Sequence, residues 1–275
     1  MTFLEEPGSY LEVDSGVELY YEDVGSGMPL IFIPGWTFTT EMFAHQKAYF
    51  RNTHRVVSFD PRSHGRSTVT THGNNYTEQG ADLAKLMDVL GLEDAVLVGW
   101  SFGALAAWSY VRQFGLDNLK GVVTIDLSPR TLSPDPNAWV EGPLDEIGAA
   151  YNAYLQTPEG QREFVEAYAQ GVMFQRELSA AELFWIVEQS LKTPTHLAAN
   201  YFAAGMFEDY REEAQQIDAD MPALVVIAEH WAETAVPFMN NLCPRTRTEV
   251  LGGHMMFYEH AERFNAILEA FLSSI

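Results

Sequence analysis

The sequence has little of three things: cysteine, positive charge and long apolar runs. Its 275 residues include a single cysteine, Cys243, which excludes an internal disulfide and suits a reducing compartment. Lys and Arg number 16 against 38 Asp and Glu, and this net charge of −22 argues against nucleic acid or an anionic membrane surface as a partner. No stretch approaches the roughly 18 continuous apolar residues of a membrane helix. We therefore expect a soluble, cytoplasmic protein that binds neither nucleic acid nor membrane.

Two further patterns are missing. Residues 1–7 contain no basic region followed by an apolar run, so we expect no signal peptide. The histidines lack metal-ligand spacing such as H-E-x-x-H, and we expect no metal and no other cofactor. What the chain does have is enough apolar material for a large core, since 47% of its residues are hydrophobic.

The stretch around which the chain is organised is Gly99-Trp100-Ser101-Phe102-Gly103. A short apolar run, residues 94–98, precedes it, and small residues follow it over 104–111, which indicates a buried strand, a sharp turn and a helix. In this setting a G-x-S-x-G turn exposes its serine above a sheet as a nucleophile. A Cβ at either glycine is expected to collide with neighbouring backbone. Alone, the pentapeptide is equally typical of an ordinary glycine-flanked turn.

Strands and helices alternate on both sides of this turn. We expect strands at residues 10–14, 17–23, 29–33, 55–59, 94–98, 121–125, 223–227 and 247–251. Expected helices of this part of the chain cover residues 41–50, 77–90, 104–111 and 259–272. Such spacing favours right-handed crossovers, so the predicted fold class is α/β, a mostly parallel sheet flanked by helices.

The alternation stops between residues 128 and 220, where only helix signals occur. Four helices are predicted there, at residues 144–155, 160–174, 180–191 and 195–206, the third behind the capping box Ser179 to Glu182. A connector rich in proline precedes them. We interpret residues 128–217 as a helical cap inserted into a core made of residues 1–127 and 218–275.

Three motifs in this order resemble the α/β-hydrolase fold superfamily: the loop Pro34-Gly35-Trp36 after a buried strand, the Ser101 turn, and the late Gly252-Gly253-His254. Residues 60–67 are similar to the D-x-R-G-x-G-x-S turn of that family, with Ser63 where a glycine is usual. The resemblance covers most of the core and is nearest to the capped serine esterases and the cofactor-free haloperoxidase/perhydrolase branch.

This resemblance implies an α/β-hydrolase fold with a cap, and it implies ester hydrolysis as the activity. The implied protein is a carboxylesterase that cleaves small to medium apolar acyl or aryl esters through an acyl-enzyme, with a perhydrolase side activity when peroxide attacks that intermediate. Ser101 is the implied nucleophile and His254 its base, because imidazole titrates near neutrality. The implied oxyanion donors are the backbone N–H groups of Phe102 and Trp36.

The triad acid departs from the commonest family pattern. That pattern has an Asp in the loop after the strand at 223–227, where this chain has Trp231. Asp126 closes the strand that follows the Ser101 turn, a position that some relatives use, and it keeps the order Ser, Asp, His. An Asp at a strand end also caps turns, and Glu229 and Glu233 are alternatives. We take Asp126 as the acid.

Aromatic side chains are expected to form an apolar pocket around the serine. We place Trp36, Phe38, Trp100, Trp185 and Phe202 there, although packing between helices is the commoner role for aromatic residues of the kind found in the cap. Two other functions stay open. One is a cofactor-free dioxygenase of the 3-hydroxy-4-oxoquinoline type, whose members carry histidines beside the serine, and the other is a ligand receptor on the same scaffold.

Overall fold

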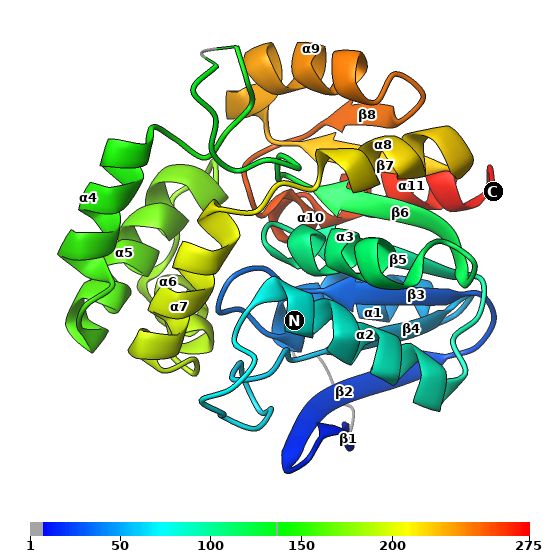
Figure 1. The fold of residues 1–275 in the computed structure, drawn as a ribbon, viewed down its shortest axis with the longest axis horizontal. Coiled ribbons are helices and arrows are strands. Elements are labelled where there is room, and N and C mark those ends of the chain that lie inside the picture. Colours follow the sequence, from blue (N-terminus) through cyan, green and yellow to red (C-terminus); the bar gives the residue numbers. More distant parts are fainter. Residues whose placement is uncertain (1–7, 136) are drawn as a thin grey trace.

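An eight-stranded sheet forms the centre of the protein in the computed structural model, which describes residues 8–135 and 137–275 (Figure 1). The strand order is β1-β2-β4-β3-β5-β6-β7-β8. The strands are β1 (Ser9–Asp14), β2 (Val17–Gly25), β3 (Pro29–Ile33), β4 (Arg55–Phe59), β5 (Ala95–Trp100), β6 (Leu119–Ile125), β7 (Ala223–Ile227) and β8 (Arg247–Val250). Only β2 runs antiparallel to its neighbours β1 and β4; the other pairs are parallel. The predicted mostly parallel sheet is confirmed.

The central strands are apolar throughout because helices cover both faces of the sheet. Every residue of β3 and β5 is buried. One face, carrying Ile31 and Leu97, packs against α2 (Tyr76–Leu90) and α3 (Gly103–Phe114). The other, carrying Leu30 and Val96, packs against α1 (Ala44–Phe50) and α11 (Ala261–Leu272). Figure 1 shows α2 and α3 on the near face and α1 and α11 behind the sheet.

The helix-only segment lies to one side of the sheet, at the left of Figure 1. Its helices are α4 (Leu144–Tyr154), α5 (Pro158–Tyr168), the π-helix η2 (Ala169–Met173), α6 (Ala180–Ser190) and α7 (Thr195–Met206). The predicted capping box is present, with the Ser179 hydroxyl accepting from the Glu182 N–H and the Glu182 carboxylate accepting from Ser179. The next helix, α8 (Arg211–Asp220), lies beside α3 over the sheet (Figure 1).

Several elements differ from the sequence prediction. The helix predicted at 160–174 ends as an α-helix at Tyr168 and continues as η2. Helices α8 and α9 (Ala232–Leu242) were not predicted: α8 is strongly polar, and α9 carries Pro237 in its interior, where proline normally argues against a helix. Short elements complete the chain: η1 (Thr40–Phe43), η3 (Glu229–Trp231) and α10 (Met256–Glu259).

In the described part of the chain, no helix is both long and apolar enough to cross a membrane. The segment 1–7, for which we expect no signal peptide, lies outside the described residues, as does Pro136 of the connector.

Candidate active site

Ser101 lies in the sharp turn between β5 and α3. Its φ is +51°, a left-handed conformation that is uncommon outside glycine. The turn is held on both sides by backbone hydrogen bonds: the Ser101 N–H donates to the Ile125 carbonyl at 2.8 Å, and the Ala104 N–H donates to the Ser101 carbonyl at 2.8 Å. The serine is thus fixed by its two flanking elements and by the neighbouring strand β6.

Glycines allow the backbone to crowd around this serine. A Cβ built on Gly99 would lie 2.8 Å from the Ala104 Cα, and one on Gly103 would collide with the Ile33 carbonyl. The predicted requirement for glycine at both positions is confirmed. Gly35 plays the same part from the other side, since a Cβ there would lie 2.9 Å from the Ser101 Cβ. The loop after β3 therefore passes directly against Ser101.

His254 and Asp126 form a buried hydrogen-bonded pair. The His254 Nδ1 lies 2.7 Å from the Asp126 Oδ2, and the other carboxylate oxygen accepts the Ala228 N–H at 2.7 Å. An ionised carboxylate at this position would only accept, so a neutral imidazole paired with it would carry its proton on Nδ1 and present Nε2 as the lone-pair nitrogen. Asp126 is 1% exposed and has a φ of +53°. It ends β6 in the same conformation with which Ser101 ends β5.

The position of His254 is fixed through its backbone. The Trp100 indole N–H donates to the His254 carbonyl at 2.9 Å, and the His254 N–H donates to the Val172 carbonyl of η2 at 3.1 Å. The histidine loop is thereby tied both to the strand that carries Ser101 and to the helical insertion.

The two alternative acids lie elsewhere. Glu229 is exposed, and its carboxylate accepts from the Gln175 amide at 2.8 Å and from the Gly252 N–H at 3.3 Å. Glu233 is also exposed, in the first turn of α9. Neither has a hydrogen bond or ion pair with His254 among the described residues, whereas Asp126 does.

Two backbone N–H groups beside Ser101 are without a hydrogen-bond acceptor among the described residues, those of Phe102 and Trp36. Phe102 is the N-cap residue of α3, whose positive dipole end points towards the turn. The Trp36 indole donates to the Ala198 carbonyl of α7 at 2.7 Å, and Thr37, with a φ of +63°, shares a 2.6 Å hydrogen bond with Ser190. The insertion thus fixes the loop that carries the Trp36 backbone N–H.

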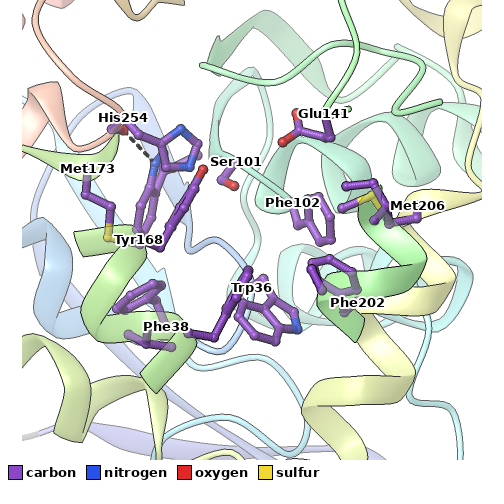
Figure 2. A pocket seen from close by; sticks show the side chains of 15 residues that line it. Trp36, Phe38, Ser101, Phe102, Glu141, Tyr168, Met173, Phe202, Met206 and His254 are labelled. Atoms are coloured by element: carbon purple, nitrogen blue, oxygen red, sulfur yellow. Dashed lines mark hydrogen bonds between the residues drawn. The ribbon is translucent and has the colours of Figure 1, made fainter. Parts of the chain in front are cut away.

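A cavity of about 220 Å³ opens in front of Ser101 (Figure 2). His254 and Ser101 both line its wall. The lining is mostly apolar and aromatic and consists of Trp36, Phe38, Trp100, Ser101, Phe102, Glu141, Ile147, Ala150, Phe164, Val165, Tyr168, Met173, Phe202, Met206 and His254. The insertion supplies nine of these fifteen residues, so the cavity lies between the sheet edge and the helices α4, α5 and α7.

Residues 28–261 match the alpha/beta hydrolase fold family. The chain belongs to this family. A non-heme haloperoxidase of Rhodococcus erythropolis is 29% identical to this hydrolase over 280 residues, which cover 96% of this chain and 99% of the haloperoxidase. A bifunctional esterase/perhydrolase of Acinetobacter calcoaceticus is 32% identical over 123 residues, 44% of this chain and 45% of that protein.

Solved structures show the same fold. An esterase from Exiguobacterium antarcticum superimposes with a TM-score of 0.86 at 24% identity, over 97% of this hydrolase and 100% of the esterase. The predicted membership of the α/β-hydrolase superfamily, near its haloperoxidase and esterase members, is confirmed.

Four of the five predicted pocket aromatics line the cavity, and Trp185 does not. Trp36, Phe38, Trp100 and Phe202 face it. The ring of Trp185 instead stacks on Tyr258 of α10, with the centroids 5.7 Å apart. The prediction for Trp185 is therefore corrected. The periodicity of α6 alone does not tell which neighbouring element a given face of the helix packs against, because this depends on tertiary contacts.

Two polar cavity residues were not predicted, Tyr168 and Glu141. Tyr168, at the end of α5, lies edge-on to His254 with the centroids 5.5 Å apart. Burial, followed by the charges of Glu141 and Asp126, raises the pKa of its hydroxyl well above the usual value, so it stays protonated. Glu141 lies in the connector before α4. An acid between Val140 and Gly142 in an apolar stretch was the only signal for it in the sequence.

Proposed function

We propose that this alpha/beta hydrolase is a serine carboxylesterase that cleaves small to medium acyl or aryl esters through an acyl-enzyme. The observation that carries the proposal is the 2.7 Å contact of His254 with Asp126 on a cavity wall that also holds Ser101. A base whose Nδ1–H is held by a carboxylate leaves its Nε2 free to take the serine proton, which is the arrangement that a serine nucleophile requires.

The proposed reaction uses each of these groups in turn. His254 Nε2 takes the Ser101 proton as the Oγ attacks the ester carbonyl, and Asp126 stabilises the imidazolium that forms. The free N–H groups of Phe102 and Trp36 bind the oxyanion, each worth about 3 kcal/mol of barrier. The imidazolium then gives its proton to the departing alkoxide. Water, activated by the same histidine, hydrolyses the acyl-enzyme.

Hydrogen peroxide in place of water would give a peracid from the same acyl-enzyme. The relatives named haloperoxidase and perhydrolase support such a side activity. We further propose that the helices α4 to α7 act as a lid that sets substrate size, because α4, α5 and α7 line the cavity while the reacting groups come from the sheet.

The test is hydrolysis of p-nitrophenyl esters from acetate to dodecanoate by wild type and Ser101→Ala. We expect turnover of the short esters and a loss of several orders of magnitude in kcat in the variant. Circular dichroism checks that the variant folds. A wild-type protein that hydrolyses no ester but consumes O₂ with a 3-hydroxy-4-oxoquinoline would be a dioxygenase instead. One that binds esters without converting them would be a receptor.

A further inference from the structure

Glu141 is a half-buried acid on the wall of the apolar cavity. Its backbone is fixed, since its N–H donates to the Thr131 carbonyl at 3.0 Å. Its carboxyl group makes no hydrogen bond or ion pair with any residue that the structure describes. Figure 2 shows this group pointing into the space in front of Ser101, on the side opposite His254. No lysine or arginine is among the described residues that line the cavity.

Such a group is costly for folding unless something else binds it. A carboxylate removed from water without a partner loses hydration that the apolar walls do not replace. Burial accordingly raises the pKa of Glu141 to about 7. The charge of His254 lowers this pKa, and the charge of Asp126 raises it. Near neutral pH a cationic ligand would convert this acid to its ionised form and supply the missing partner.

The aromatic walls of the cavity are suited to the same kind of ligand. Trp36, Phe164 and Phe202 meet edge to face, with centroids 5.5 to 6.0 Å apart. Aromatic faces attract ammonium groups, most strongly where water is excluded. At long range, the net charge of −22 raises the local concentration of cations and lowers that of anions.

We propose that the preferred ester carries one ammonium group, which Glu141 binds as its counter-ion within the aromatic cavity. This inference rests on the proposed esterase function and names its substrate class. The ammonium group lies on the acyl part or on the alcohol part of the ester. It belongs to the part that points away from His254 when the ester carbonyl lies at Ser101.

The test compares pairs of esters that have the same shape and differ in charge. The alcohol-side pair is 2-(trimethylammonio)ethyl acetate and 3,3-dimethylbutyl acetate. The acyl-side pair is p-nitrophenyl trimethylammonioacetate, whose charge is permanent, and p-nitrophenyl 3,3-dimethylbutanoate. For each pair, the ratio of kcat/KM for the cationic ester to that for the neutral ester is measured at pH 8 in wild type, Glu141→Gln and Glu146→Gln. The last variant changes net charge equally at an exposed position of α4 outside the cavity.

We expect this ratio to fall roughly 10- to 100-fold in Glu141→Gln for at least one pair, the size of a charge-assisted contact. Glu146→Gln should keep the wild-type ratio. Equal ratios in all three proteins, with neutral esters still hydrolysed at Ser101, would overturn the inference and leave the esterase function standing.

A binding measurement separates the two proposals if no ester is turned over. Trp36 and Trp100 line the cavity, so their fluorescence reports a ligand there. Choline should bind wild type more tightly than its neutral analogue 3,3-dimethylbutan-1-ol, and Glu141→Gln should lose this preference. A preference that survives in Glu141→Gln, or is absent in wild type, would contradict the role of Glu141 whatever the reaction is.

Discussion

The two walls of the cavity are built in different ways. On the sheet side, Ser101 and Asp126 end adjacent strands in left-handed conformations, and backbone hydrogen bonds to the neighbouring strands hold both. On the helix side, rings such as Phe164 and Phe202 are held by packing against one another, and the Glu141 carboxyl group has no hydrogen-bond or ion-pair partner among the described residues. A wall fixed by backbone geometry suits chemistry, which tolerates little displacement, whereas a packed wall can change its shape one side chain at a time.

This difference predicts that substitutions on the sheet side stop the reaction and that substitutions on the helix side change which ester is preferred. The expected effects decrease from the triad acid to the aromatic wall and then to the stability of the lone carboxyl group.

The largest effect is expected from Asp126→Asn. The amide keeps an oxygen for the Ala228 N–H but no longer holds the His254 imidazole in the required tautomer, which in serine proteases costs about 10⁴ in kcat. Glu229→Gln and Glu233→Gln serve as matched controls, since both acids are exposed and neither contacts His254. Turnover of p-nitrophenyl acetate measures the three variants. Near-normal kcat in Asp126→Asn together with a collapse in either glutamate variant would reassign the acid.

A smaller change, in preference rather than in rate, is expected from Phe202→Ala. Phe202 contacts both Trp36 and Phe102 at the cavity wall, so its removal should favour longer acyl chains over acetate by roughly tenfold or more in kcat/KM. Trp185→Ala is the control on the same insertion, because its ring stacks on Tyr258 outside the cavity and should leave the ranking unchanged. A ranking that is the same in Phe202→Ala would mean that this ring only packs.

The smallest expected effect is on stability, in Glu141→Gln. The pKa of Glu141 rises from 4.5 to about 7 on folding, so between these values the folded state holds a proton that the unfolded state has lost. Wild-type stability should therefore decrease as pH rises across this window, and the amide removes that decrease. Thermal unfolding at pH 8 should show Glu141→Gln roughly a few degrees more stable than wild type, with the difference gone near pH 4.5. The groups whose charge acts on this carboxyl, His254, Asp126 and Tyr168, are unchanged in the comparison. An equal difference at both pH values would show that folding does not raise the pKa of Glu141.

The sheet wall could be predicted because short sequence patterns determine it. Glycines flank Ser101 where a Cβ cannot fit, apolar runs end at the sheet edge that carries Ser101, and Asp126 directly follows the last residue of β6. Ser63 is accommodated in the same way as Ser101, with a φ of +62° at the position where the motif that it resembles has glycine. These are local constraints, and local constraints are visible in a sequence.

The helix wall could not be predicted because its residues meet only through tertiary contacts. Trp185 and Phe202 both belong to apolar stretches of cap helices, yet the first faces Tyr258 and the second faces the cavity. Glu141 lies in an irregular connector with no periodicity. Its place depends on Thr131, whose hydroxyl donates to carbonyls of α7 while its own carbonyl accepts the Glu141 N–H.

The most direct test of the account is covalent labelling of the serine. A p-nitrophenyl alkylphosphonate should release one equivalent of p-nitrophenol, stop ester turnover and add one phosphonyl group, which peptide mass spectrometry locates on Ser101. The Ser101→Ala protein should remain unlabelled. A label on another residue, or unlabelled protein that keeps hydrolysing esters at the wild-type rate, would contradict a mechanism through an acylated Ser101.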